Sequence, residues 1–289
     1  MSSENFVIPT GVEESLAVSV LPTCLRTEIS RDVSTSLDMT KRSVGMTEGP
    51  ADVTEKLFAS LDVYHDVASR SAALNMAIDE ALLEIATKPL IRFYKWDHPA
   101  LSFGYFGKFA DVANHAPTHD IVRRWTGGGI VFHGDDLTYS VVIPVADSAF
   151  GESSMSIYEK IHSAVSVAFA ATGKSVELAP VAALDEGRTN NATAIDHCYR
   201  REECFANPVR ADVLSNGRKI AGAAQRRTRR GLLQQGSIQD VALNEEFADQ
   251  LASELGSKRC QKTLDEHLIA RANEIAEEKY RTGMWLRKR

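Results

Sequence analysis

The chain has 289 residues, of which 44% are hydrophobic and 25% are charged, and its formal net charge at pH 7 is -6. No stretch approaches the roughly 18 to 20 consecutive apolar residues that span a bilayer, so we expect no association with membranes. The acidic balance argues against broad affinity for nucleic acid.

Residues 1–55 have the composition of a disordered extension. They are rich in Ser, Thr and Glu, carry one aromatic residue, Phe6, and show no sustained helical or strand period. The first residues lack the basic start and apolar run of a secretory signal, which predicts a cytoplasmic protein. Met39 and Met46 precede the first patterned segment and are alternative candidate starts of translation.

Residues 57–145 predict a sheet with one helix. A strand-like run at 57–66 precedes AALNMAIDEALLEIA (72–86), whose apolar residues recur at helical spacing. PLIRFYKW and ALSFGYF predict two strands of a hairpin, because a turn containing Pro99 separates them. Residues 121–145 add a strand, a glycine turn and two more strands, which favours antiparallel pairing in a mixed sheet.

The second half predicts a long helix, a hairpin and a helical tail. Residues 154–173 have apolar residues on one helical face, with Ser154 or Ser156 as the candidate cap. Residues 209–227 predict a hairpin turning at Asn216 and Gly217, and 231–241 a last strand. Helices are expected at 244–256 and 262–279. One α+β domain over 56–289, with a short helical carboxy-terminal tail, is the simplest architecture.

Three segments carry candidate chemistry. Three consecutive glycines, Gly127 to Gly129, suit a place where a ligand approaches the main chain. Lys219 lies in a strand of small and apolar residues, so an inward ammonium would need a partner such as a carboxylate or a developing oxyanion. Cys204 is a candidate nucleophile if a nearby cation favours its thiolate. The plainer interpretations are a tight turn, a solvated lysine and an inert thiol.

The four cysteines are sparse, and no CxxC pair indicates a metal site or a redox switch. They are Cys24, Cys198, Cys204 and Cys260. We therefore expect free thiols and no metal.

Five ordered segments resemble the catalytic domain shared by lipoate and biotin protein ligases and octanoyltransferases. They are NMAIDEALLE, RFYKWDHPALSFGYF, RRWTGGGIVFHGDDLTYSVVIP, CFANPVRADVLSNGRKIAGAAQRR and LLQQGSI. The resemblance implies an α+β fold with mixed, largely antiparallel sheets and packed helices. The absence of a biotin-ligase-like GRGRxGR loop favours the lipoate branch.

The segment with Cys204, Phe205 and Pro208 resembles that of cysteine-dependent octanoyltransferases. This resemblance implies that Cys204 takes octanoate from octanoyl-acyl carrier protein as a thioester, without a cofactor. The acceptor would be a lysine of a lipoyl carrier domain, either glycine cleavage H protein or a 2-oxoacid dehydrogenase E2, and Lys219 would contact the acyl carbonyl. The implied substrate-binding residues are Arg124, Thr126, Gly127, Gly128, Gly129, His133, Gly222, Gln235 and Gly236.

Two alternatives stay open. The TGGGI turn with His133 is closer to the ligases, and Gln235 stands where the family usually has histidine. The glycine turn with His133 favours an ATP-dependent lipoate-protein ligase that forms a lipoyl-adenylate with Mg²⁺. A non-catalytic protein that binds lipoyl carriers or acyl groups is the second alternative, which Lys219 disfavours. The basic residues 226–230 predict either a docking site for an acidic carrier or a solvated hairpin edge.

Overall fold

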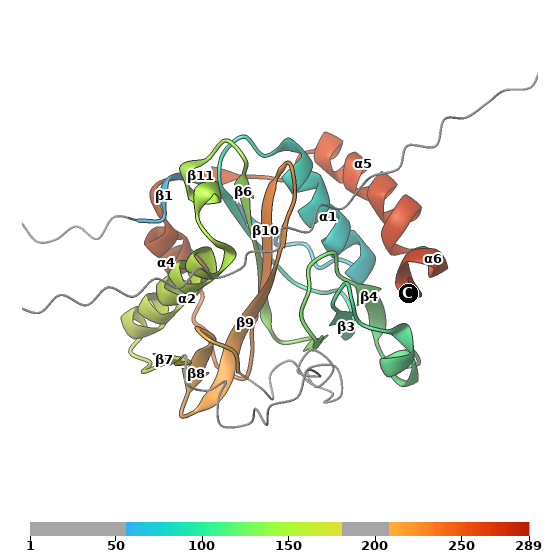
Figure 1. Cartoon of the computed structure of the whole chain (residues 1–289), viewed down its shortest axis with the longest axis horizontal. Helices are drawn as coiled ribbons and strands as arrows, with labels where there is room; N and C mark the ends of the chain where they lie inside the picture. The colour runs from blue at the N-terminus through green and yellow to red at the C-terminus, as the bar shows by residue number, and fades with distance from the viewer. Residues whose placement is uncertain (1–55, 181–207, 289) are drawn as a thin grey trace, which may run out of the picture. The chain divides into compact units, whose positions relative to one another are not determined.

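The computed structural model describes residues 56–180 and 208–288, and the expected extension at 1–55 lies outside them. The described strands form an eight-stranded sheet, β11-β1-β2-β6-β10-β9-β8-β7, and a three-stranded sheet, β4-β3-β5 (Figure 1). Six of the nine pairings among these strands are antiparallel. The predicted mixed, largely antiparallel α+β fold is confirmed.

The described elements have the following bounds. The strands are β1 (Phe58–His65), β2 (Leu90–Tyr94), β3 (Ala100–Phe103), β4 (Asp120–Arg123), β5 (Ile130–His133), β6 (Leu137–Pro144), β7 (Glu177–Leu178), β8 (Val213–Ser215), β9 (Arg218–Arg227), β10 (Gly231–Ile238) and β11 (Gly256–Lys262). The α-helices are α1 (Ala72–Ile85), α2 (Ser154–Ala171), α4 (Phe247–Leu255), α5 (Glu266–Ile275) and α6 (Gly283–Leu286). Short 3-10 helices are η1 (Phe109–Asp111), η2 (Ala113–His115) and η3 (Ser148–Gly151), and η5 (Ala276–Tyr280) is a π-helix.

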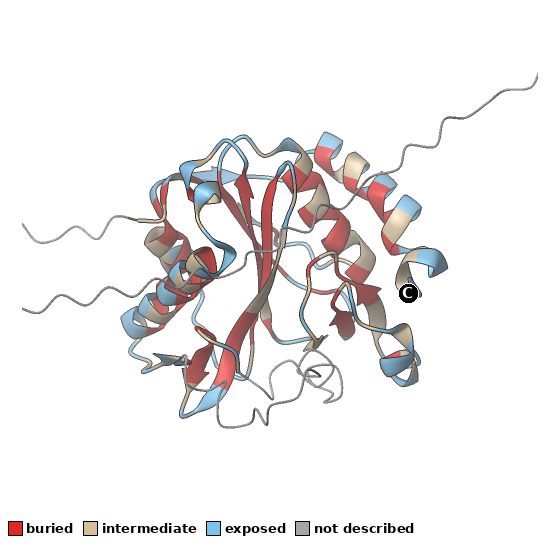
Figure 2. Cartoon of the chain, in the orientation of Figure 1, coloured by how far each residue is buried: buried red, intermediate tan, exposed pale blue. Residues whose placement is uncertain are grey.

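Helices cover both faces of the large sheet. Val141 and Ile143 of β6 belong to the apolar cluster that includes α2 and α4, whereas Val142 between them belongs to the cluster of α1 and α5. This follows from the alternation of side chains along a strand. Figure 2 shows the buried residues along the sheet and on the helix faces turned towards it. The central strands are therefore buried on both sides.

The caps define where the two long helices begin. Ser71 accepts a hydrogen bond from the Leu74 amide at the start of α1, and Ser153 accepts one from the Ser156 amide at the start of α2. Ser153 has the extended backbone of a cap residue, with φ -66° and ψ 151°. The predicted cap at Ser154 or Ser156 was therefore wrong, because both of these residues lie inside the helix.

Two elements differ from the predictions. The strands expected to form a hairpin, β2 and β3, belong to different sheets: β2 lies between β1 and β6, whereas β3 pairs with β4 and β5. Strand β11 was not predicted, because GSKRCQK is exposed beyond its first residue and shows no apolar alternation. It pairs in parallel with β1 at the sheet edge, so the tail is not only helical. None of the described helices is long and apolar enough to cross a membrane.

Candidate active site

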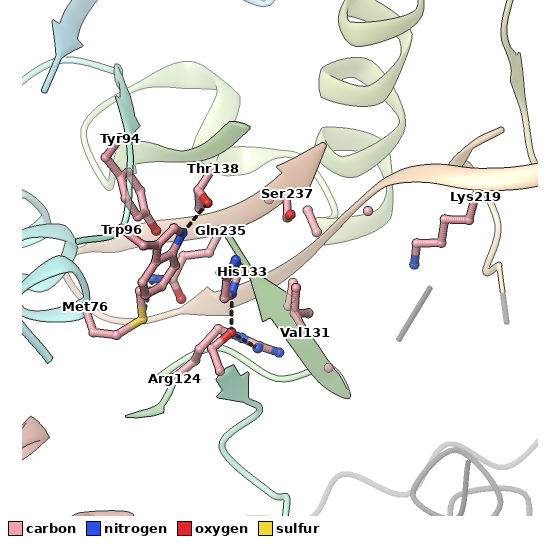
Figure 3. A pocket seen from close by; sticks show the side chains of 16 residues that line it. Met76, Tyr94, Trp96, Arg124, Val131, His133, Thr138, Lys219, Gln235 and Ser237 are labelled. Atoms are coloured by element: carbon pink, nitrogen blue, oxygen red, sulfur yellow. Dashed lines mark hydrogen bonds between the residues drawn. The ribbon is translucent and has the colours of Figure 1, made fainter. Parts of the chain in front are cut away.

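A pocket lies between the two sheets. Strands β9 and β10 supply one wall, and β3, β5 and the glycine turn supply another. Figure 3 shows Met76, Tyr94 and Trp96 together at one end and Lys219 at the opposite end. The lining residues are Met76, Tyr94, Trp96, Ser102, Arg124, Gly128, Val131, His133, Thr138, Lys219, Gly222, Ala223, Ala224, Gln235, Gly236 and Ser237. The walls are mainly apolar, which suits an alkyl chain, and the polar groups lie at defined points along them.

Seven of the residues predicted for the site line this pocket. They are Arg124, Gly128, His133, Lys219, Gly222, Gln235 and Gly236. Thr126, Gly127 and Gly129 belong to the same glycine turn but are not among the lining residues. Cys204 and Cys198 lie outside the described residues. The exposed Cys260 on β11 does not line the pocket.

The glycine turn packs against the backbone of Gly104. A Cβ atom at Gly104 would lie 2.0 Å from the Gly128 carbonyl oxygen, so this close approach requires glycine. Gly128 has φ +84°, in the left-handed region that favours glycine. The Tyr105 amide donates to the Thr126 carbonyl oxygen at 2.8 Å. The turn is therefore built for close packing as well as for access to the main chain.

A chain of hydrogen bonds in the pocket wall joins Arg124, Ser102 and His133. The Arg124 guanidinium donates to Ser102 Oγ at 2.6 Å, and Ser102 Oγ lies 2.7 Å from His133 Nε2. His133 Nδ1 lies 2.8 Å from a carboxylate oxygen of Asp136. Because the carboxylate accepts from Nδ1–H, Nε2 accepts the Ser102 hydroxyl proton. Burial lowers the pKa of His133, which is consistent with this neutral form.

Asp136 fixes several pocket residues at once. Its Oδ2 accepts hydrogen bonds from the hydroxyls of Thr138 and Ser237 as well as from His133. Trp96 donates its indole N–H to Thr138 and stacks on the His133 ring with centroids 4.1 Å apart. Burial favours the neutral carboxyl, but the hydrogen bonds of His133, Ser237 and Thr138 hold the pKa of Asp136 below its usual value. Sequence reasoning missed Asp136, although its position three residues after His133 was the available signal.

Gln235 connects the glycine turn to helix α1. Its side-chain oxygen accepts from the Thr126 hydroxyl at 2.8 Å, and its amide nitrogen donates to Asp79 at 2.7 Å. Asp79 is also bound by Arg92 at 2.8 Å, and both side chains are fully buried. Thr126 itself does not line the pocket. It is buried and holds the Gln235 side chain, which does line the pocket.

Lys219 is buried and paired with a carboxylate. Its Nζ lies 2.8 Å from Asp212 Oδ2, and its side chain is 4% exposed. The lysine chain lies across Gly222, because a Cβ atom there would lie 2.3 Å from Lys219 Cε. The expectation that Lys219 points inward towards an anionic partner is confirmed. Sequence reasoning did not identify Asp212 as that partner.

Two of the basic residues at 226–230, Arg226 and Arg227, point in different directions. Arg226 stacks over the rings of Tyr105 and Trp125, whereas Arg227 donates to the carbonyl oxygens of Phe150 and Glu152. Neighbouring residues of β9 point to opposite faces of the sheet, so the two guanidinium groups diverge.

The contacts of Arg123 are structural. Its guanidinium donates to five backbone carbonyl oxygens, including those of Trp285, Leu286 and Lys288 near the carboxy terminus.

The family model of the lipoyl protein ligase A/B catalytic domain matches residues 71–279. The chain belongs to this family. All residues that line the pocket fall within the matched lipoyl protein ligase A/B catalytic domain.

Two curated relatives of this domain are bacterial. Octanoyltransferase LipM of Brevibacillus brevis is 34% identical over 176 residues, covering 58% of this chain and 62% of the relative. Octanoyltransferase LipM of Oceanobacillus iheyensis is 36% identical over 179 residues, covering 58% of this chain and 60% of the relative. The chain thus matches about three fifths of the length of these relatives.

The lipoyl protein ligase fold also appears among solved structures. The bi-partite lipoate protein ligase of Thermoplasma acidophilum, described with its E2 lipoyl domain, has a TM-score of 0.52 and 19% identity. The match covers 79% of this chain and 96% of that one. At 19% identity, the similarity between the two chains shows a shared fold alone.

Within the described residues, no group of three or more His, Cys, Asp or Glu side chains could hold a metal ion.

Proposed function

We propose that this protein is an octanoyltransferase that transfers an octanoyl group to a lysine of a lipoyl carrier domain. The observation that carries the proposal is the sequence identity of 34% and 36% to the two LipM octanoyltransferases. The pocket supports it independently, because a mainly apolar cavity ends at a buried lysine. The Thermoplasma acidophilum ligase, described with its E2 lipoyl domain, supports an E2 lipoyl domain as the acceptor. Glycine cleavage H protein is the other proposed acceptor.

The geometry indicates how the acyl group would lie. Met76, Tyr94 and Trp96 surround the end of the pocket away from Lys219 (Figure 3). An octanoyl chain would place its methyl end there and its carbonyl near the Lys219 ammonium. Charge that develops on the carbonyl oxygen during transfer would then meet a preorganised cation in a water-poor site. Removing one such donor costs roughly 100- to 1,000-fold in rate in well-studied enzymes.

Cys204 is the proposed nucleophile, and octanoyl-acyl carrier protein is the proposed donor. The Cys204 thiolate would attack the donor thioester, and the tetrahedral intermediate would release the donor thiol and leave an octanoyl-Cys204 thioester. The neutral acceptor lysine amine would then attack this thioester, forming an amide, expelling the Cys204 thiolate and giving up one proton, which balances the proton taken up by the released donor thiol. No nucleotide or metal enters either step.

The covalent chain allows Cys204 to reach Lys219. The Val209 amide donates to Asp212 at 2.6 Å, and the same carboxylate oxygen lies 2.8 Å from Lys219 Nζ. Cys204 precedes Val209 by five residues, and an extended chain spans at most about 3.6 Å per residue, or roughly 18 Å here. This tether supports the proposed role of Cys204 near the lysine.

The arrangement of the other groups is part of the proposal. Arg124 and His133 would shape the pocket around the acyl head group through Ser102, and Gly128 and Gly236 would form its close walls. Gln235 and Thr126 would hold the glycine turn in place.

We also propose that residues 56–289 form the catalytic domain, that residues 1–55 are an extension and that the enzyme works in the cytoplasm.

Transfer to a purified carrier domain tests this function. The full chain is incubated with octanoyl-acyl carrier protein and a lipoyl carrier domain, with and without ATP and Mg²⁺, and the carrier is weighed by mass spectrometry. We expect ATP-independent octanoylation in wild type and strong loss in Lys219→Ala. Modification only from free octanoate or lipoate with ATP would instead establish the ligase alternative. Tight carrier binding with no modification under either condition would establish a non-catalytic binding protein.

A further inference from the structure

We infer that Asp212 and Tyr158 are positioning residues that hold the Lys219 ammonium at its end of the pocket. The inference rests on the proposed role of Lys219 in acyl transfer. Asp212 immediately precedes β8, and Tyr158 lies on helix α2. Neither residue lines the pocket. Both would act on the reaction through the lysine.

A chain of contacts leads from the ammonium to the backbone of the pocket wall. Lys219 Nζ lies 2.8 Å from Asp212 Oδ2, and the other oxygen, Oδ1, accepts the Tyr158 hydroxyl at 2.6 Å. The Tyr158 oxygen in turn accepts the Ala223 amide at 3.1 Å. Because Ala223 lines the pocket, one tyrosine hydroxyl connects the lysine's counterion to the strand that forms the wall.

The Asp212 carboxylate is itself held in place. Its side chain is fully buried, and Oδ2 also accepts the Val209 amide at 2.6 Å. Ala211, next to it, has φ +65°, a backbone conformation that is uncommon for alanine. His162 donates from Nδ1 to the Ala211 carbonyl oxygen at 2.7 Å, which stabilises that conformation. The position of the carboxylate is therefore determined by contacts from both the loop and helix α2.

The surrounding charges favour one ion pair at this place. Burial, followed by the Asp212 charge, raises the pKa of Tyr158 well above its usual value, so its hydroxyl stays protonated and donates. Burial lowers the pKa of His162 to about 4, so this ring is neutral near pH 7 and adds no second cation. A buried ammonium without its carboxylate would be strongly disfavoured. Among the described residues, Asp212 thus maintains both the charge and the direction of Lys219.

Matched variants separate positioning from general stability. Asp212→Asn keeps the shape but removes the counterion, Asp212→Glu restores it, and Tyr158→Phe removes only the bridging hydroxyl. Tyr280→Phe is the control, because Tyr280 is also buried and its hydroxyl also donates to a carboxylate, that of Glu80, at 2.6 Å, but neither of these two residues lines the pocket. The kcat and KM of octanoyl transfer to the carrier domain are measured for each full-length variant.

We expect Asp212→Asn to lower kcat by roughly 10- to 100-fold with little change in KM, the range of one charge-assisted hydrogen bond. Tyr158→Phe should lower kcat less, by about 3- to 10-fold. Asp212→Glu should recover part of the rate, and Tyr280→Phe should match wild type. A folded Asp212→Asn variant with wild-type kcat would overturn the inference.

A second readout keeps the positioning role separate from the proposed function. In protein labelled with ¹³C-lysine, the Lys219 Cε signal is assigned by its loss in Lys219→Arg and is compared between wild type and the variants at one pH. We expect its chemical shift to change in Asp212→Asn and to change less in Tyr158→Phe. If wild type transfers no octanoyl group yet these shifts occur, the proposed function fails and the positioning network stands. If the signal does not move, the network is wrong whatever the activity.

Discussion

Nδ1 of His133 and Oδ2 of Asp136 lie 2.8 Å apart in the wall of the pocket, and both side chains are nearly inaccessible to solvent. The same carboxylate oxygen accepts the hydroxyls of Thr138 and Ser237. One carboxylate therefore sets the tautomer of His133 and, through Thr138, the orientation of Trp96. This relationship makes Asp136 a sensitive position for both stability and pocket shape.

Asp136→Asn should lower the free energy of unfolding by about 1 to 3 kcal/mol, because an amide cannot accept all of these donors. Its amide group would also face His133 Nδ1–H and so disturb the tautomer. Denaturant unfolding measures the change, and Asp135→Asn is the control, since Asp135 is exposed. Equal stability of the two variants would contradict the central place given to Asp136.

Stability should fall as the pH drops from about 6.5 to 4.5. The pKa of His162 is lowered to about 4 and that of His133 is also lowered, both by burial. The unfolded chain therefore binds protons below its histidine pKa of about 6.5 while the folded chain does not, so stability is lost as pH falls. His162 alone should contribute about 2 to 3 kcal/mol over this window.

The carboxylates contribute below this window. The pKa values of Asp66 and Asp136 are lowered from 3.8, so their stabilising contribution is lost only as the pH falls below about 4. His162→Asn, whose amide can still donate to the Ala211 carbonyl, should reduce the slope of the unfolding free energy against pH by up to about 1.4 kcal/mol per pH unit between pH 6.5 and 4.5. An unchanged slope in this variant would show that His162 is not the group that titrates.

Gln235 should be necessary for the link between the glycine turn and helix α1. Gln235→Leu leaves the Thr126 hydroxyl without its acceptor and removes one of the donors to Asp79 Oδ2, which keeps the Tyr94 hydroxyl; it should cost about 1 to 3 kcal/mol in unfolding free energy. Gln235→Glu should cost more at pH 7, because it sets two carboxylates together, and should recover as the pH falls. Gln261→Leu on the exposed part of β11 should be close to neutral. A Gln235→Glu variant with pH-independent stability would contradict this account.

Gly222→Ala should impair transfer more than stability. The new Cβ would lie 2.3 Å from Lys219 Cε and 2.5 Å from Nζ, so the flexible lysine must leave its position across the strand. If Lys219 stabilises the acyl oxyanion, transfer should fall by about 100-fold or more. Gly151→Ala, where a Cβ would meet nothing within 4 Å, should keep wild-type transfer. Near-normal kcat in Gly222→Ala would show that the precise position of Lys219 is unimportant.

Local patterns predicted the elements whose determinants are local. The hairpin of β8 and β9 follows from Asn216 and Gly217, both of which have positive φ. Helices α1 and α2 follow from apolar residues at helical spacing. Strand β11 had no such pattern: it is stabilised by parallel pairing with β1, about two hundred residues earlier in the chain. The separation of β2 from β3 likewise depends on pairings with distant strands.

The residues of the candidate site also divide into those that local sequence predicts and those whose role depends on the fold. Lys219 and the glycine turn were predictable, because a lysine among small strand residues and three consecutive glycines are unusual locally. Asp136 and Ser102 are ordinary polar residues in sequence, and their importance follows from the hydrogen bonds that the fold creates. The position of Cys204 in the site stays a prediction, because it lies outside the described residues.

The most direct test of the account is intact-protein mass spectrometry after incubation with octanoyl-acyl carrier protein in the absence of ATP. Wild type, Cys204→Ala and Cys198→Ala are compared, since both cysteines belong to the same stretch of sequence. We expect a hydroxylamine-labile octanoyl adduct on wild type and Cys198→Ala and none on Cys204→Ala. An adduct that persists in Cys204→Ala, or carrier modification that requires ATP and forms no adduct, would contradict transfer through a Cys204 thioester.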